Sequence, residues 1–245
     1  MGCNSCECNG ELEFGIQMAF QPIVDVVTQE IYSYEALVRG MNGESAYSIL
    51  GQVSEENKYR FDQLCRVTAI ETMAKLDSSA RVNINFLPNA IYEPETCLRR
   101  TLAAAKKFGF PHENIIFEVT EHEEVENYDL LKSIFETYHG KGFKTAIDDF
   151  GEGYAGLNLL AEFQPSLLKL DMKLIQGIAT DRVKQSILAG TLVTARSLGI
   201  EIIAEGIETE EDYRCLCEHG VELMQGYYFA KPAIGALPQV DSALF

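Results

Sequence analysis

The chain has 245 residues, of which 47% are apolar, and its formal net charge at pH 7 is −17. The apolar content is sufficient for a large hydrophobic core and argues against a disordered chain. The negative charge argues against binding to a nucleic-acid backbone or an anionic membrane surface, because both attract positively charged proteins.

The N-terminal segment MGCNSCECNG holds Cys3, Cys6 and Cys8 in polar surroundings. It lacks the cationic and apolar regions of a secretory signal, and no apolar run approaches the roughly 20 residues that span a bilayer. We therefore expect a cytoplasmic protein without membrane association. The cysteines could hold zinc or an iron–sulfur centre, but no second cluster supplies the remaining ligands at a usual spacing. A flexible tail over residues 1–12 is the prediction, with a metal or redox role as the alternative.

Residues 13–245 alternate between strand-like and helix-like stretches and are expected to form one domain. Apolar strand-like runs lie near 16–24, 31–39, 81–87, 115–120, 144–149, 167–171, 200–205 and 222–229. Helical spacing of apolar residues occurs near 56–77, 94–108, 123–139, 154–163, 181–198 and 208–219. Several of these stretches end in glycine, which is typical of a helix C-terminus.

Strands that alternate with helices predict an α/β barrel. The first two strands are an exception, because only Val-Val-Thr-Gln-Glu separates QPIVD from IYSYEALVR. This connection is too short for a crossover helix, so these strands should pair antiparallel. The predicted fold class is therefore α/β: a modified TIM-type (β/α)8 barrel with one antiparallel strand at its start.

Five acidic residues stand at or near the ends of strand-like runs: Glu35, Glu118, Asp148, Asp149 and Glu205. Active sites of α/β barrels collect at the C-terminal ends of the strands, so these side chains should converge there. Clustered carboxylates repel one another unless protons or cations neutralise them. Oxygen donors suit hard cations such as magnesium, calcium and manganese. The pattern therefore predicts an acidic metal site.

Polar residues at other strand ends are expected at the same mouth, and each also has a simpler interpretation. Arg39 shares a strand face with Glu35, where it could bind phosphate or form a surface ion pair. Lys169 could serve the site or pair with Asp171. Asn85 is a candidate ligand, although Asn83 lies on the same strand face.

The acidic residues have structural alternatives of their own. Asp148 could cap the helix that follows the glycines after it, and Asp149 could stabilise the turn. Glu205 could be an isolated charge at the mouth of the barrel. Only the set as a whole favours a metal site.

The motifs, in this order, resemble the EAL-domain cyclic di-GMP phosphodiesterases. The resemblance runs from about Met18 to Pro232 and rests on QPIVD at 21–25, EALVR at 35–39, Asn85, EVTE at 118–121, DDFGEGY at 148–154, KLD at 169–171, AEGIET at 204–209 and QGYYFAKP at 225–232. The family often has Asn-Leu-Ser where this chain has Asn85-Phe86-Leu87, and the chain also departs from it at Glu152 and Ala155. None of these departures removes a ligand.

The resemblance implies a barrel hydrolase with two divalent cations, Mg or Mn, that opens cyclic di-GMP to linear pGpG. It implies Glu35, Asn85, Glu118 and Asp148 as ligands of a first metal. Asp148 would bridge to a second metal, which Asp149 and Glu205 would serve. Two cations can clamp the attacking and leaving oxygens of an in-line displacement at a phosphodiester.

Further roles are implied by the same resemblance. The catalytic set would be Lys169, Glu35, Glu205 and Gln225, with Lys169 holding the attacking water. Gln21 and Arg39 would contact the substrate. Glu121 would steady the loop 150–159, which contributes to the family's homodimer interface.

Two competing functions remain. A catalytically silent receptor would bind cyclic di-GMP without cleaving it, but such relatives usually lose a ligand or the lysine, and all are present here. A dinucleotide-cofactor protein is suggested by Gly151-Glu-Gly-Tyr-Ala-Gly156, which matches G-x-G-x-x-G after a strand. Asp148 and Asp149 oppose it, because they would repel a pyrophosphate.

Overall fold

The structure is a computed structural model that describes residues 12–91, 93–120, 128–151 and 156–245. The tail with Cys3, Cys6 and Cys8, the predicted loop residue Glu121 and the middle of the G-x-G-x-x-G segment lie outside the described residues. In the described part, no helix combines the length and apolar character of a membrane-spanning segment.

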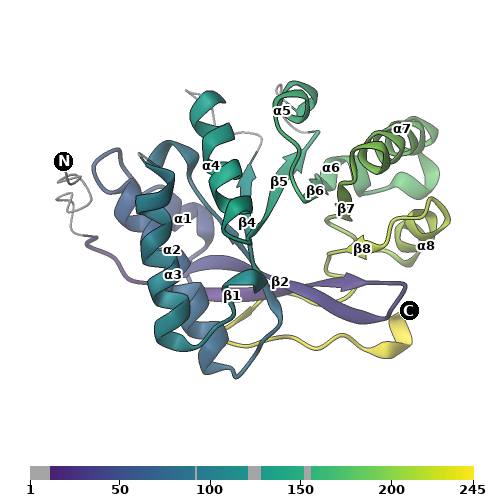
Figure 1. Ribbon diagram of the computed structural model, residues 1–245. Coiled ribbons are helices and arrows are strands. Elements are labelled where there is room, and N and C mark those ends of the chain that lie inside the picture. The colour runs from purple at the N-terminus through teal and green to yellow at the C-terminus, as the bar shows by residue number, and fades with distance from the viewer. Residues whose placement is uncertain (1–11, 92, 121–127, 152–155) are drawn as a thin grey trace.

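A closed barrel of eight strands forms the centre of the molecule (Figure 1). The strands are β1 Ile16–Asp25, β2 Glu30–Gly40, β3 Arg81–Asn85, β4 Ile115–Thr120, β5 Lys144–Phe150, β6 Leu167–Leu170, β7 Glu201–Ala204 and β8 Leu223–Met224. Strands β2 to β8 run parallel in sequence order, and β1 closes the barrel between β8 and β2. The predicted barrel is confirmed.

Strand β1 is antiparallel to both of its barrel neighbours, as its short connection to β2 predicts. The pairing with β2 extends from Ile16 opposite Gly40 to Asp25 opposite Glu30. The turn is fixed by Asp25, whose Oδ1 accepts hydrogen bonds from the backbone N–H groups of Val27 and Thr28. This hairpin places residues of β1 at the mouth although the strand runs in the opposite direction.

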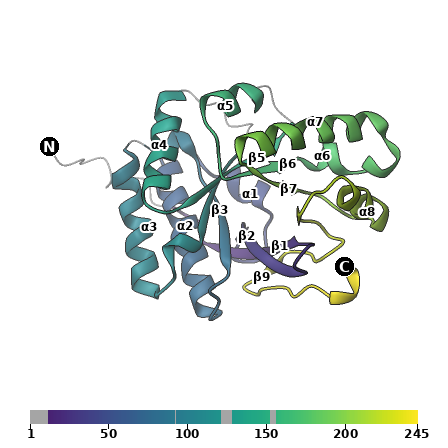
Figure 2. The same ribbon diagram turned by 45° about the vertical axis from the view of Figure 1, so that its right-hand side comes forward.

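Helices lie around the outside of the strands (Figure 2). They are α1 Ala46–Leu50, α2 Lys58–Lys75, α3 Pro94–Phe108, α4 Tyr128–Gly140, α5 Gly156–Glu162, α6 Met172–Ile175, α7 Arg182–Leu198 and α8 Glu210–Glu218. Individual residues fix several helix ends. The Thr209 side chain caps the N-terminus of α8. Gly109 and Gly199 adopt the left-handed conformation at the C-termini of α3 and α7.

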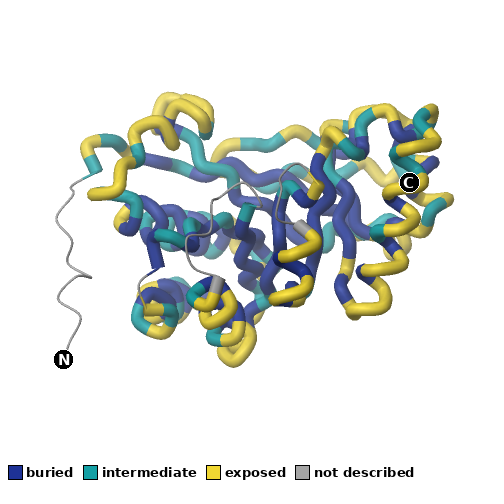
Figure 3. Tube along the Cα trace, turned by 90° about the horizontal axis from the view of Figure 1, so that it is seen from above, coloured by how far each residue is buried: buried dark blue, intermediate teal, exposed yellow. Residues whose placement is uncertain are grey.

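Two apolar clusters hold the strands in place. In Figure 3 the buried residues lie along the inner segments of the chain and the exposed residues along the outer ones. The larger cluster lies between the strands and the helices. The smaller one fills the barrel interior and contains one residue from each of six strands: Ile23, Ile116, Ala146, Leu167, Ile203 and Leu223. Because side chains of a strand alternate between its faces, the residue two positions further along each strand also faces the interior.

The end of the barrel differs from the sequence prediction. Of the strand expected near 222–229 only Leu223–Met224 forms, because the chain turns at Gly226 to pack against Ile207. The backbone N–H of Ile207 donates to Gln225, and that of Tyr228 donates to Ile207. The two short helices α1 and α6, and the strand β9 Ala233–Ile234 that pairs with β1, were not expected. They have too few residues to show a hydrophobic period.

The close approach at Gly226 generates a stability prediction. A Cβ atom there would lie 2.0 Å from the carbonyl oxygen of Ile207, which is backbone and cannot rotate away. We expect Gly226→Ala to lower the free energy of unfolding by at least about 2 kcal/mol in urea titrations, because overpacking forces a backbone shift. The control is Gly140→Ala in α4, where no atom lies within 4 Å of the new Cβ. A Gly226→Ala protein as stable as wild type would contradict the close packing.

Candidate metal centre

A polar layer lies directly above the apolar interior of the barrel. Its members follow the interior residues of their strands by two positions: Glu118 after Ile116, Asp148 after Ala146, Lys169 after Leu167, Glu205 after Ile203 and Gln225 after Leu223. Because β1 runs the other way, its member Gln21 precedes Ile23 instead. The two-residue period therefore brings side chains to one level of the barrel from four strands and from the positions just after β7 and β8.

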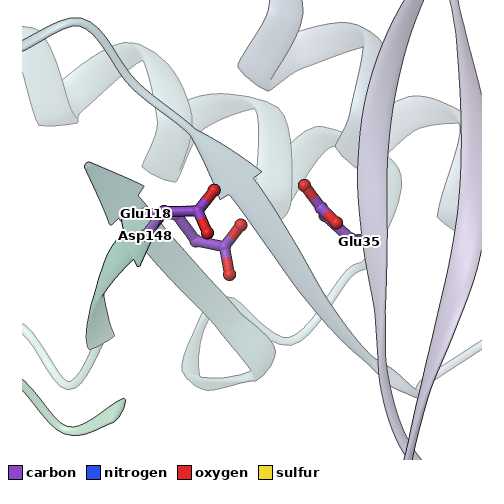
Figure 4. A group of neighbouring side chains, drawn as sticks. All are labelled: Glu35, Glu118 and Asp148. Atoms are coloured by element: carbon purple, nitrogen blue, oxygen red, sulfur yellow. The ribbon is translucent and has the colours of Figure 1, made fainter. Parts of the chain in front are cut away.

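The carboxylates form two overlapping groups. Oxygen atoms of Glu35, Glu118 and Asp148 lie within 4.8 Å of one another, and Figure 4 shows these side chains pointing into a common space. Oxygen atoms of Asp148, Asp149 and Glu205 form a second group within the same distance. Asp148 belongs to both groups, which confirms the predicted convergence of all five acidic residues.

A local irregularity explains how two consecutive aspartates reach one site. Neighbours in a regular strand point to opposite faces, so Asp148 and Asp149 should diverge. Asp149 instead has a φ of 55°, and the pairing of β5 with β6 shifts between Ile147 and Phe150. The left-handed residue in this bulge directs both carboxylates toward Glu205.

Lys169 is the cationic centre of the cluster. Its side chain is fully buried, and its Nζ lies 2.7 Å from Glu205, 3.0 Å from Asp148, 3.2 Å from Glu118 and 3.7 Å from Glu35. The alternative that Lys169 forms an ion pair with Asp171 is wrong. The Asp171 carboxylate instead accepts a hydrogen bond from the backbone N–H of Lys173 and caps α6. One ammonium group cannot balance five carboxylates.

The charge imbalance appears in the pKa values of the buried groups. Burial, together with Asp148 and Glu35, raises the pKa of Glu118 to about 8 against the lowering effects of Lys169 and Asn83. Burial and Asp148 likewise raise the pKa of Glu205 well above its ordinary range. Burial lowers the pKa of Lys169, but the surrounding carboxylates outweigh it and the net pKa is raised. Without added cations, the cluster therefore retains protons at neutral pH.

Two asparagines of β3 contact the cluster from successive inward positions. Asn85 lies in register with Glu118, and its Nδ2 donates to Glu35 at 3.3 Å. Asn83 is fully buried, and its Nδ2 donates to Glu118 at 2.7 Å. The Oδ1 of Asn83 has no hydrogen-bond partner among the described residues. Asn85 lies nearer the open end, so it is the better placed of the two to offer an oxygen to a cation.

Two glutamines complete one side of the site. The Nε2 of Gln225 donates to Glu35 at 2.6 Å and to the Oε1 of Gln21 at 3.2 Å. Gln21 in turn donates to the backbone oxygen of Ala230 at 3.1 Å. These bonds fix the Glu35 carboxylate, which is 6% exposed and is not part of a surface ion pair.

Arg39 is not part of the buried cluster. Its side chain is partly exposed, and its Nη1 donates to the backbone oxygen of Val38 at 2.7 Å. It lies four residues beyond Glu35 along β2, toward the rim. The structure therefore brings together every other described residue of the predicted site and leaves Arg39 at the edge.

An open pocket of about 280 Å³ lies over the cluster. Its lining includes the predicted residues Gln21, Glu35, Asp148, Asp149, Glu205 and Gln225. It also includes residues that the sequence analysis missed, among them Met172 of the short helix α6 and Tyr227 after β8. Tyr227 is 54% exposed in this wall, and only its place two residues after Gln225 could have suggested it.

The residues present fit divalent cations. All potential ligands are carboxylate or amide oxygens, which hard cations prefer. Lys169 supplies too little positive charge to balance the carboxylates, so added cations would be favourable. Because Asp148 belongs to both carboxylate groups, it could offer one oxygen to a cation in each of them. The fold and site thus define an α/β barrel protein with an acidic candidate metal centre at the C-terminal ends of its strands.

Comparison with known proteins identifies the family. The model of the EAL domain matches residues 12–232, so the chain belongs to the EAL domain family. It is 30% identical over 223 residues to the blue light- and temperature-regulated antirepressor BluF of Escherichia coli, and 29% identical over 227 residues to the probable cyclic di-GMP phosphodiesterase PdeN of the same species. These matches cover 91% and 88% of this chain but only 55% and 43% of those proteins.

Solved structures show the same fold. A standalone versatile EAL protein from Vibrio cholerae, in a form bound to c-di-GMP, is 55% identical with a TM-score of 0.92, and the match covers 96% of this chain and 99% of that one. Klebsiella pneumoniae BlrP1, in a manganese and cyclic di-GMP complex, is 31% identical with a TM-score of 0.87 over 95% of this chain and 59% of BlrP1.

The raised pKa of Glu118 predicts how stability depends on pH in the absence of metal. The folded protein holds a proton up to about pH 8, whereas the unfolded chain releases it near 4.5. Stability is therefore highest below pH 4.5 for this group and decreases as pH rises toward 8. We expect the melting temperature of EDTA-treated protein to decrease over this range, and manganese to raise it more at pH 8 than at pH 6.

Glu118→Gln is the control for this prediction. The amide does not titrate, so the melting temperature of this variant should change less with pH and respond less to manganese. An unchanged pH profile in Glu118→Gln would show that the ionisation of Glu118 does not cause the dependence.

Proposed function

We propose that this chain is a cyclic di-GMP phosphodiesterase that opens the cyclic dinucleotide to linear pGpG with two divalent cations, magnesium or manganese. The observation that carries the proposal is the shared Asp148. It joins two carboxylate groups into one site, in contact with a buried lysine. Such a site matches the charge of two adjacent cations.

The chain's residues would hold the cations in two sets. Glu35, Asn85, Glu118 and Asp148 provide oxygens for the first position, and Asp148, Asp149 and Glu205 for the second. Bound there, the cations would withdraw charge from a phosphodiester and lower the pKa of water. The family resemblance also assigns Glu35 and Glu205 to the catalytic set, and both side chains contact Lys169.

Lys169 and the glutamines would act on the reacting groups. The Nζ of Lys169 has three N–H donors and lies among four carboxylates, so it can hold an attacking water and a phosphate oxygen in place. Gln225 fixes Glu35, and Gln21 lines the pocket beside it. Arg39 at the rim would contact a phosphate that extends out of the pocket.

The relatives support this function and also define its alternative. PdeN is named a probable cyclic di-GMP phosphodiesterase, and the Vibrio and Klebsiella structures contain the dinucleotide. BluF is named an antirepressor, so a silent receptor remains the competing function. The complete set of acidic residues and Lys169 favours the enzyme. Homodimerisation, a cytoplasmic location and a role for Glu121 in steadying the loop 150–159 are parts of the proposal.

Direct cleavage separates the two functions. We expect purified protein with magnesium or manganese to convert cyclic di-GMP to pGpG, measured by chromatography, and EDTA to stop the reaction. Lys169→Met should lower kcat by at least about 100-fold, because it removes both the charge and the donors beside the phosphate. Lys144→Met, which removes a lysine that pairs with Glu201 at the opposite end of the barrel, is the control. Binding of cyclic di-GMP without cleavage under all metal conditions would establish the receptor instead.

The shared aspartate predicts a pattern of metal stoichiometry. We expect calorimetry with manganese to show two sites in wild type. Glu118→Gln should weaken one site and Asp149→Asn the other, because each residue belongs to only one carboxylate group. Asp148→Asn should weaken manganese binding at both sites, because Asp148 belongs to both carboxylate groups. Loss of a single site in Asp148→Asn would rule out bridging.

A further inference from the structure

Helix α2 carries a buried ion pair, Asp62 and Arg66, that lies outside the acidic cluster. Asp62 and Arg66 lie one turn apart on α2, and their exposed fractions are 2% and 0%. The Arg66 Nε lies 2.8 Å from Asp62 Oδ2, and its Nη2 donates to Oδ1 at 3.3 Å. Apolar residues of similar size would often stabilise such a position as well or better, so stability alone does not account for the pair.

The pair holds the chain immediately beyond Asn85. Strand β3 ends at Asn85, so the backbone after it lacks a regular strand partner. The N–H of Leu87 donates instead to Asp62 Oδ1 at 3.0 Å, and the N–H of Phe86 donates to the backbone oxygen of Glu118 at 2.9 Å. The Asp62 carboxylate thereby fixes the strand end from which the Asn85 side chain reaches Glu35.

The guanidinium group of Arg66 contacts the neighbours of two candidate ligands. Its Cζ lies 5.5 Å from the ring centre of Phe86, which follows Asn85, and 4.8 Å from that of Phe117, which precedes Glu118. Its Nη1 donates to the hydroxyl of Tyr138 on α4 at 2.9 Å. The planar cation therefore lies between two helices and the aromatic rings of Phe86, just after β3, and Phe117, in the middle of β4.

Asp62 is also close to the metal centre in space. It lines a cavity of about 320 Å³ together with Asn85, Leu87 and Asp148. The Asp62 carboxylate belongs to neither of the two carboxylate groups of the candidate metal centre. Its oxygens accept hydrogen bonds from Arg66, Leu87 and Gln63. Its influence on the cluster therefore passes through the backbone.

We propose that Asp62 is a positioning residue that holds the end of β3, and with it Asn85, in the geometry needed to bind metal, and that Arg66 is its ion-pair partner. Asp62 positions Asn85 by accepting the Leu87 N–H, and Arg66 holds the Asp62 carboxylate in place from its other side. This inference rests on the proposed metal site. Partners that orient metal ligands typically contribute 10–100-fold to affinity.

Two double variants separate positioning from charge. Asp62→Leu/Arg66→Leu removes the ion pair without leaving a buried charge, and it also removes the acceptor for Leu87. Asp62→Asn/Arg66→Leu removes the same pair but keeps an oxygen acceptor at residue 62. The Gln63 amide can turn to meet the new Asn N–H, since its Oε1 lacks a hydrogen-bond partner within the described residues. A third protein, Glu201→Gln/Lys144→Met, loses an ion pair remote from the site.

The measurement is manganese affinity by calorimetry on proteins shown to be folded by circular dichroism and thermal melting. We expect Asp62→Leu/Arg66→Leu to bind at least one manganese about 10-fold more weakly. Asp62→Asn/Arg66→Leu and Glu201→Gln/Lys144→Met should stay near wild type. Equal affinities in wild type and Asp62→Leu/Arg66→Leu, or equal losses in the two double variants at residues 62 and 66, would overturn the inference.

Two further outcomes are distinguishable. Wild type that binds no manganese would overturn the proposed metal site and, with it, this inference. If Asp62→Leu/Arg66→Leu does not fold, amide hydrogen exchange of metal-free wild type gives the answer. Protection of the Leu87 N–H supports the role of Asp62, and exchange at the rate of an exposed amide overturns it.

Discussion

The repulsion among carboxylates confined to the mouth of a barrel is the constraint on which the site depends. Glu35, Glu118 and Asp148 are almost completely removed from water, yet oxygen atoms of the three side chains lie within 4.8 Å of one another. Lys169 is the one cationic side chain that contacts them among the described residues. The protein maintains this unfavourable arrangement because each acid is attached to a different rigid strand, and the apolar layer beneath them holds the strands together.

Much of this arrangement could be read from the chain. A strand that carries Ile116 inward must also carry Glu118 inward, and the same holds for Leu167 and Lys169. The short β1–β2 connection fixes their antiparallel pairing for a similar reason, since too few residues are available for any other path. Convergence of the acids followed from strand period and barrel topology, and the family resemblance added their roles.

Other features depend on contacts that no local pattern encodes. The left-handed backbone at Asp149 arises from a bulge in the β5–β6 pairing, and a regular strand pattern would have separated it from Asp148. The choice between Asn83 and Asn85 depends on their depth in the barrel. The Asp62–Arg66 pair joins α2 to the end of β3, and its two residues look like an ordinary charged pair on a helix. Tertiary packing determines all three.

The separation of the apolar interior from the polar layer above it affects how this scaffold evolves. Ile116, Ala146 and Ile203 pack together in an apolar cluster that contains none of the acids two residues beyond them. A lineage can therefore exchange one acid for a neutral side chain while its folding remains intact. Loss of a ligand need not entail loss of the fold in such a scaffold, so descendants that no longer hold a cation can persist as ligand-responsive modules.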